Sequence, residues 1–328
     1  MLALGAVVGG SAAFSAESKL ALPLNCVPGE TCWVVNRVDV DPGPKAVDHT
    51  CDDHTYDDHK GFDIAIAGGG AMRRGVEVLA AAPGRVVGTR DEMPDIDVSI
   101  AGRASVTGRE CGNGVIIQTD EGWRHQYCHM RRGSVVPHNG VRVEKGDLLG
   151  YVGMSGLAQF PHLHLQVSRN GVFFDPDTGF AMGEVFCGTE GVPMWDEATQ
   201  AALSANTSAI HISGFAPNVP KPDDARDGAY DFAIIAPSAP ALLVWFDVYR
   251  PDLGDRLTVK ITAPGGETLI HKTILVKKDQ ARRFMYVGAK RKALVWPPGR
   301  YEATINLVRA HNRGEQDIHL ATTIEPSS

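Results

Sequence analysis

The stretch "HLHLQVSRNGVFFDP" (residues 162–176) gives the strongest indication of the fold. Side chains alternate between the two faces of a β-strand, so His162 and His164 share one face and the leucines beside them share the other. An Asn-Gly pair follows at residues 170 and 171, which is typical of a tight hairpin turn. The stretch therefore predicts two antiparallel strands with two imidazoles on one face and apolar side chains on the opposite face.

Similar strand and turn signals occur along the first part of the chain. Residues 75–90 predict a strand, a Pro-Gly turn and a second strand, and residues 114–130 predict a hairpin. Residues 141–153 predict another hairpin, with Lys145, Gly146 and Asp147 at its turn. No long helical pattern interrupts these runs, so residues 26–187 are expected to form an antiparallel domain of linked β-hairpins.

The remainder of the chain predicts a second β-rich unit. Residues 188–226 are expected to be a linker with one short helix, capped near Asp196. Residues 227–328 contain strand-like runs at regular spacing over about 100 residues, a length that suits an immunoglobulin-like sandwich. The expected fold class is mostly β, with a hairpin domain followed by a β-sandwich.

Composition agrees with two globular domains. The chain has 328 residues, of which 43% are hydrophobic and 22% are charged. The formal net charge of −7 argues against a dedicated nucleic-acid-binding protein. The acidic excess lies before Lys221, and the segment after it is mildly basic, which suggests two units with separate roles.

The N-terminal residues 1–16 resemble the back half of a secretory signal peptide. An apolar run from Leu2 to Val8 is followed by small residues, with cleavage expected after Ala13 or Ser15, although the basic start of such peptides is missing. The run is too short for a transmembrane helix, which needs about 20 residues. No other segment is predicted to span a membrane, so we expect a periplasmic or secreted protein.

Six cysteines support export, because an even number in an exported chain predicts disulfides. Cys111 and Cys128 bracket the open end of the hairpin predicted for residues 114–130, which favours their pairing. The expected set is completed by the pairs Cys32–Cys51 and Cys26–Cys187. A cysteine zinc site is the less favoured alternative, because the chain has no Cys-x-x-Cys pair.

Further polar residues accompany the two strand histidines. His59 and Asp63 flank Gly61, which lets the backbone turn between them, and Asp63 begins an apolar run. A buried carboxylate needs a partner, and a metal ion would satisfy it. The aspartates and histidines that precede this pair are interpreted as a solvated acidic loop. In "WRHQYCHM" (residues 123–130), His125 and His129 are expected on one strand face, and either suits proton transfer.

Together these motifs resemble those of a known family. "HKGFD" (59–63), "YCHM" (127–130) and "HLH" (162–164) are similar, in this order, to the His-x-x-x-Asp, Tyr-x-His and His-x-His motifs of the lysostaphin-type (LytM-like) zinc metallopeptidases. The resemblance covers about residues 45–180. It implies one zinc ion per chain, bound by His59, Asp63 and His164. It also implies that His129 and His162 are catalytic histidines.

The resemblance implies hydrolysis of peptide bonds in the stems or cross-links of bacterial peptidoglycan. Two positions depart from the family pattern: Phe160 stands where the family usually has Gly, and Met130 where it often has Leu. Neither is a ligand position, but Phe160 is expected to alter one wall of the substrate groove. No His-Glu-x-x-His motif exists, so the proton work falls to His129 and His162.

Three alternatives stay open at this point. The first is a non-enzymatic zinc-binding or cell-wall-binding regulator of the same fold. The second is a phosphocarrier-like β-domain, which predicts a cytoplasmic protein without disulfides. The third concerns the C-terminal unit, where a basic patch for anionic envelope polymers competes with ordinary solvated loops. The residues of that patch are Lys277, Lys278, Arg282, Arg283, Lys290, Arg291 and Lys292.

Overall fold

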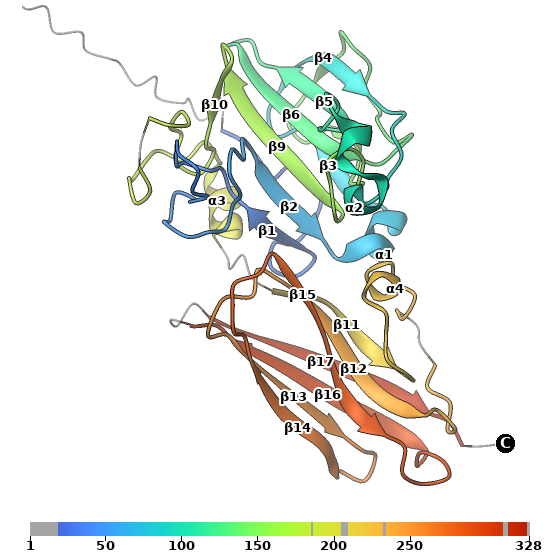
Figure 1. Cartoon of the computed structure of the whole chain (residues 1–328). Coiled ribbons are helices and arrows are strands. Elements are labelled where there is room, and N and C mark those ends of the chain that lie inside the picture. Colours follow the sequence, from blue (N-terminus) through green and yellow to red (C-terminus); the bar gives the residue numbers. More distant parts are fainter. Residues whose placement is uncertain (1–18, 185, 205–208, 232–233, 311–313, 327–328) are drawn as a thin grey trace, which may run out of the picture.

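The computed structural model describes residues 19–184, 186–204, 209–231, 234–310 and 314–326, and these form two β-rich parts (Figure 1). The predicted fold class is confirmed, because all ladders between the named strands are antiparallel and a β-sandwich follows the N-terminal sheet. The predicted signal-like segment 1–16 lies outside the described residues. Among the described helices, none has the length and apolar character needed to cross a membrane.

The N-terminal part is built on an eight-stranded sheet with the order β1-β2-β9-β6-β5-β4-β7, and β10 pairs with β9. A second, two-stranded sheet contains β3 and β8. The strands are β1 (Cys32–Asn36), β2 (Phe62–Ile66), β3 (Glu77–Leu79), β4 (Gly84–Arg90), β5 (Asn113–Gln118), β6 (Trp123–Met130), β7 (Arg142–Val143), β8 (Leu148–Tyr151), β9 (His162–Arg169) and β10 (Val172–Phe174). Short helices connect them: α1 (Gly68–Arg74), α2 (Val98–Ala101) and the 3-10 helix η2 (Arg103–Val106).

Two of the three predicted hairpins are confirmed, namely β5–β6 and β9–β10. Asn170 and Gly171 have φ of 52° and 82°, the positive values that a primed two-residue turn requires. The hairpin predicted for residues 141–153 is wrong, because β7 pairs with β4 and β8 pairs with β3. β8 buries Leu149 in the core opposite the large sheet, so β7 and β8 belong to different sheets.

The predicted linker is more structured than expected. Its short helix is present as α3 (Glu197–Leu203), and the Asp196 carboxylate accepts a hydrogen bond from the Thr199 N–H, as an N-cap does. However, residues 188–226 also contain β11 (Ala209–Ala216) and α4 (Pro222–Arg226). β11 pairs with β12, so the first strand of the sandwich lies inside the stretch predicted as a linker.

The C-terminal part packs a three-stranded sheet, β11-β12-β15, on a four-stranded sheet, β14-β13-β16-β17. Buried side chains from both sheets, among them Phe246, Leu257 and Tyr301, fill the space between them. Seven strands in two antiparallel sheets suit an immunoglobulin-like sandwich. Its strands after β11 are β12 (Ala241–Tyr249), β13 (Arg256–Thr262), β14 (Thr268–Leu275), β15 (Arg282–Lys290), β16 (Gly299–Val308) and β17 (Glu315–Ile324).

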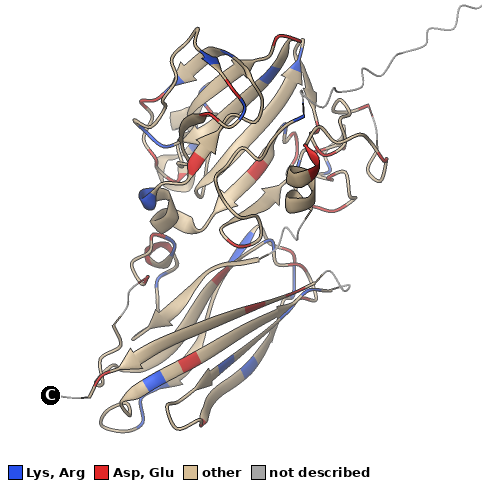
Figure 2. Ribbon diagram, turned by 180° about the vertical axis from the view of Figure 1, so that it is seen from behind, with Lys and Arg blue, Asp and Glu red and all other residues tan. Residues whose placement is uncertain are grey.

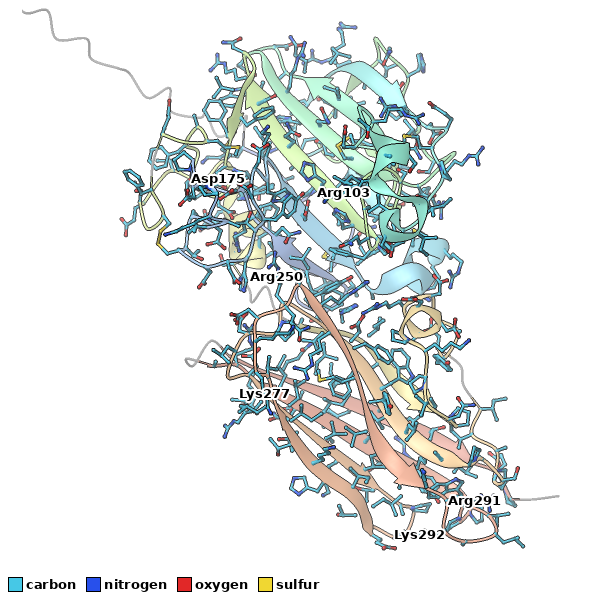
Figure 3. The ribbon with its side chains drawn as sticks, viewed as in Figure 1. Arg103, Asp175, Arg250, Lys277, Arg291 and Lys292 are labelled. Atoms are coloured by element: carbon cyan, nitrogen blue, oxygen red, sulfur yellow. A yellow bond between two sulfur atoms is a disulfide. The ribbon has the colours of Figure 1, made fainter. Side chains whose placement is uncertain are left out.

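The basic residues of the sandwich do not form one patch. Figure 2 shows Lys and Arg spread over separate strands and loops, with acidic residues among them. Arg282 and Lys290 are the first and last residues of β15, and Figure 3 places Lys277 at the opposite end of the sandwich from Arg291 and Lys292. Alternating strand faces and the length of β15 separate residues that are close in the sequence.

Three disulfides link the six cysteines. The predicted Cys111–Cys128 bond is confirmed, with a Cα–Cα distance of 4.8 Å. The two other predicted pairs are wrong, because a tight loop brings Cys26 to Cys32 and the chain before β2 meets the chain after β10 at the remaining pair, Cys51–Cys187. Disulfides of this number fit an oxidising compartment such as the periplasm or the cell exterior.

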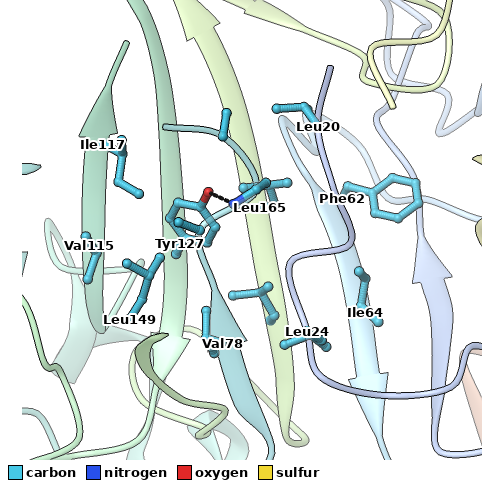
Figure 4. Close-up of a cluster of buried hydrophobic side chains, with 14 of the residues drawn as sticks. Leu20, Leu24, Phe62, Ile64, Val78, Val115, Ile117, Tyr127, Leu149 and Leu165 are labelled. Atoms are coloured by element: carbon cyan, nitrogen blue, oxygen red, sulfur yellow. Dashed lines mark hydrogen bonds between the residues drawn. The ribbon is translucent and has the colours of Figure 1, made fainter. Parts of the chain in front are cut away.

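The core of the N-terminal part lies between the large sheet and the β3–β8 sheet (Figure 4). Leu165 and Tyr127 of the large sheet face Val78 and Leu149 of the small one. The Tyr127 hydroxyl accepts a 2.8 Å hydrogen bond from the Ala81 N–H inside this core. Five further core residues lie outside the predicted range 26–187, namely Leu20, Leu24, Met194, Trp195 and Leu203.

Removal of the Tyr127 hydroxyl tests this core. In Tyr127→Phe the ring stays, but the buried Ala81 N–H loses its acceptor, which costs about 1–3 kcal/mol. Urea unfolding of the variant should show a free energy of unfolding that is lower by that amount. An unchanged unfolding midpoint would contradict a structural role for this hydroxyl.

Candidate metal centre

Three side chains converge at one point on the face of the sheet opposite the core. His59 lies in the loop before β2, Asp63 lies on β2, and His164 of β9 is the register partner of Asp63. Asp63 Oδ1 lies 2.8 Å from His164 Nδ1 and 3.3 Å from His59 Nε2, and these two nitrogens are 3.2 Å apart. The structure therefore brings together the three residues that were predicted to bind a metal ion.

The electrostatics of the cluster favour an ionised Asp63 carboxylate. Burial by itself would raise the pKa of Asp63, which is 1% exposed. The His59 and His162 imidazoles and the hydrogen bonds from His164 and His59 outweigh burial and lower the pKa of Asp63 well below its usual value. Asp63 is therefore a charged ligand candidate.

Two further imidazoles lie beside this cluster. The ring of His162 is 4.6 Å from that of His129, and His162 Nε2 lies 3.8 Å from Asp63 Oδ1. His162 Nδ1 bonds the Phe160 carbonyl at 2.8 Å, and His129 Nδ1 bonds the Ser155 carbonyl at 2.7 Å. Carbonyl oxygens only accept, so both rings carry their proton on Nδ1 and leave Nε2 as an acceptor.

Both of these imidazoles stay neutral at neutral pH. Burial, followed by the nearby His162 and His164, lowers the pKa of His129 well below its usual value. Burial also lowers the pKa of His162, and the Asp63 carboxylate partly opposes this shift. The two predicted catalytic histidines are thus suited to accept a proton.

The face predicted for His129 is wrong. Strand alternation placed it with Tyr127 and His125, but Tyr127 points into the core. His129 has φ of 61°, a left-handed conformation, and its ring lies beside His162 and His164 instead. Alternation fails here because it assumes extended backbone at every residue.

His125 does not reach the candidate site. It is 2% exposed, and its Nδ1 has no hydrogen-bond partner among the described residues. Burial lowers its pKa to about 4, and Glu121 partly opposes this shift. The alternative of His125 as the proton carrier is therefore not supported by its position.

Phe160 also differs from its predicted role. Its ring lies 4.9 Å from the His162 ring and 5.4 Å from the Tyr249 ring of the sandwich. Arg282 of β15 sits over the same ring at 5.4 Å. Phe160 therefore fills the contact between the candidate site and the sandwich, rather than forming a wall of the groove described next.

A groove of about 570 Å³ runs from the cluster across β6 and β5. The Cys111–Cys128 disulfide and Gln126 line it, and so does Tyr56, whose ring lies 4.2 Å from that of His59. Arg90 and Arg109 line it farther along. Sequence reasoning missed Tyr56 because an exposed aromatic residue in an acidic loop gives no periodic signal.

Residues 57–176 match the model described as Peptidase family M23. This segment belongs to that family. The predicted resemblance to the lysostaphin-type peptidases is therefore confirmed. The matched segment contains the three predicted metal ligands and the two predicted catalytic histidines, namely His59, Asp63, His164, His129 and His162.

Solved structures of M23 proteins also resemble this chain. A mutant catalytic domain of the prophage-encoded M23 protein EnpA from Enterococcus faecalis is 22% identical, with a TM-score of 0.32, over 46% of this chain and 92% of that one. The catalytic domain of the antimicrobial peptidase lysostaphin from Staphylococcus simulans is 20% identical, with a TM-score of 0.28, over 43% and 85%. A putative peptidase M23 from Pseudomonas aeruginosa is 24% identical, with a TM-score of 0.28, over 43% and 52%.

The cluster in the M23 domain fits a zinc ion. Two imidazole nitrogens and one carboxylate oxygen are ligands that zinc prefers. Ligand atoms in a tetrahedral zinc site are separated by about 3.3 Å, and two of the three separations here are 3.2 and 3.3 Å. His59 Nδ1 also donates to the Arg37 carbonyl at 2.6 Å, the kind of support that orients a ligand histidine.

Two other groups of histidine and aspartate have similar spacing, but in each of them an arginine already pairs with a carboxylate. His49 lies within 3.7 Å of Asp175 and Asp177, where Arg37 pairs with Asp177. His54 lies 3.4 Å from Asp252, which also pairs with Arg309. These ion pairs show that the loop before β2 is packed against its neighbours, so its interpretation as a solvated acidic loop is wrong for both histidines.

Gly61 provides a test of the cluster geometry. A Cβ at this position would lie 2.4 Å from the His164 ring atoms Cε1 and Nε2, so Gly61→Ala must displace that ring. We expect zinc affinity to fall roughly 10- to 100-fold, as for other changes that disturb a ligand's support. Gly265→Ala is the control, because nothing lies within 4 Å of its Cβ, and it should bind zinc like the wild type.

The buried His125 provides a test of pH-dependent stability. The pKa of His125 is about 4 in the folded chain, against an ordinary value of 6.5 in the unfolded chain. Between these two values the unfolded state binds a proton that the folded state does not bind. Stability is therefore complete above pH 6.5 and is lost as the pH falls towards 4, by about 2 kcal/mol between pH 7 and pH 5. Urea unfolding of His125→Leu should show a pH dependence that is weaker by this amount; parallel profiles would contradict the assignment.

Proposed function

We propose that this chain is an exported zinc metalloendopeptidase that hydrolyses peptide bonds in the stems or cross-links of bacterial peptidoglycan. The observation that carries the proposal is the convergence of His59 Nε2, Asp63 Oδ1 and His164 Nδ1. Two more imidazoles stand next to them, and a groove of about 570 Å³ leads away. Membership of a peptidase family supports the proposal.

In this proposal one zinc ion is held by His59, Asp63 and His164. When bound there, zinc would act as a Lewis acid that polarises a peptide carbonyl and makes water more acidic. His129 and His162 hold their own protons on Nδ1, so each offers a neutral Nε2 as a base. They take a proton from the attacking water and return it to the leaving amine, which is the work of general acid–base groups.

The substrate assignment rests on the groove and on the expected compartment. A groove across the face of a sheet suits an extended peptide of small residues, as found in peptidoglycan. Three disulfides agree with export to an oxidising compartment, where the cell wall lies. Binding of an anionic envelope polymer by the sandwich stays a prediction, because its basic residues are spread along β15 and its ends.

The proposal predicts the following behaviour on purified sacculi. Removal of metal should abolish hydrolysis and added zinc should restore it, while His59→Ala and Asp63→Ala should no longer hold stoichiometric zinc. His129→Ala should keep its zinc but lose activity by a factor of about 10²–10⁴. Mass spectrometry of the released muropeptides would identify the bond that is cut.

The control is His138→Ala, which removes an exposed histidine that belongs neither to the cluster nor to the groove lining and should preserve both zinc and activity. Stoichiometric zinc in Asp63→Ala would refute the ligand assignment. Zinc binding and sacculus binding without any muropeptide release would instead support the non-enzymatic regulator.

A further inference from the structure

The metal centre is supported from outside the strands that carry its ligands. Asp63 faces the imidazoles with Oδ1, while its other oxygen, Oδ2, accepts a 2.7 Å hydrogen bond from Nδ2 of Asn36. Asn36 is 8% exposed, ends β1 and is the register partner of Asp63. This hydrogen bond fixes the rotation of the Asp63 carboxylate and leaves one oxygen for the metal.

Asn36 is held in turn by Arg250, which lies in the C-terminal sandwich directly after β12 (Figure 3). Nη2 of Arg250 donates to Oδ1 of Asn36. A guanidinium has only donors, so it can bind the oxygen of the Asn36 amide but not its nitrogen. The flipped orientation of this amide is therefore excluded. The Arg250 contact therefore turns the Nδ2 of Asn36 towards Asp63.

The same guanidinium is fixed by three backbone carbonyls. Nε donates to Val35 at 2.8 Å, Nη1 to Asp53 at 3.0 Å and Nη2 to Thr55 at 3.2 Å. β1 has a bulge between Val34 and Asn36, and its extra residue, Val35, supplies the first of these carbonyls. Four hydrogen bonds from one side chain thus join the sandwich to the two segments around the metal centre.

Arg250 also has an unusual backbone. Its φ of 45° is left-handed, a conformation that costs a residue other than glycine free energy. Its N–H remains bonded to the Ala281 carbonyl at 3.0 Å, so the backbone belongs to the sandwich while the side chain reaches β1. This strained backbone thus belongs to a residue whose side chain contacts Asn36 from the sandwich.

The segment that Arg250 holds supports a second ligand as well. Arg37 directly follows Asn36, and its carbonyl accepts hydrogen bonds from His59 Nδ1 at 2.6 Å and from Thr55 Oγ1 at 2.8 Å. A shift of Asn36 therefore disturbs both His59 and Asp63.

We propose that Arg250 is a positioning residue for the metal centre and acts through Asn36 on Asp63. The C-terminal sandwich thereby sets the metal affinity of the M23 domain. This inference rests on the proposed function only in requiring that the cluster binds zinc.

The test is the zinc affinity of the full chain, measured by competition with a chromophoric chelator. Asn36→Ala should weaken zinc binding roughly 10- to 100-fold and Arg250→Gln about tenfold, as expected for residues that orient a metal ligand. In the double variant the Arg250 change should add no more than about a factor of two, because its route through Asn36 is already lost.

Arg291→Gln is the matched control. Arg291 also lies in the sandwich and donates to backbone carbonyls, but Figure 3 places it at the end remote from the M23 domain. It should leave zinc affinity unchanged. Arg250→Lys serves if Arg250→Gln does not fold, because lysine keeps the charge without the planar fork and should still weaken zinc binding.

Wild-type zinc affinity in the folded Arg250 variants would overturn the inference. The inference would also be overturned if Arg250→Gln lowered zinc affinity by the same factor in the wild type and in Asn36→Ala. That result would show that Arg250 acts by another route. A wild-type chain that binds no zinc would overturn the proposed function together with this inference. The two failures are therefore distinguishable in one set of measurements.

Discussion

The buried charge of Asp63 is the constraint on which the rest of the N-terminal part depends. A carboxylate that is 1% exposed must be paired, since an isolated charge in such a place is very costly. Two imidazoles and the amide of Asn36 provide this pairing, and they come from a loop, from β9 and from β1. The order of strands β1-β2-β9 is therefore also the order of the groups that stabilise one carboxylate.

The sequence predicts much of what depends on local spacing and misses most of what depends on distant contacts. The placement of His162 and His164 on one strand face, the turn at Asn170 and the bond between Cys111 and Cys128 follow from period-two alternation and turn chemistry. The two other disulfides, the partners of β7 and β8, and the left-handed backbone of His129 do not. The Cys51–Cys187 bond and the partners of β7 and β8 depend on which segments far apart in the chain meet in the fold. The Cys26–Cys32 loop and the backbone of His129 are local departures from the expected pattern.

His162 and His164 show how two identical residues on one strand face acquire different chemistry. His162 bonds a carbonyl through Nδ1, so its Nε2 is the free base. His164 instead points Nδ1 at Asp63 and His59, and the space for its ring exists because residue 61 has no Cβ. The tautomer and the ring orientation, rather than the spacing in the sequence, separate the two roles.

The sandwich and the M23 domain are joined through the residues that support the site. The Tyr249 hydroxyl donates to the Ile66 carbonyl, and Tyr249 and Arg282 both pack on Phe160, whose ring lies against His162. A glycine at position 160 would leave the space between His162, Tyr249 and Arg282 unfilled. Phe160 thus departs from the family pattern at the point where the sandwich packs against the M23 domain. The packing of the second domain and the geometry of the imidazoles are thus parts of the same set of contacts.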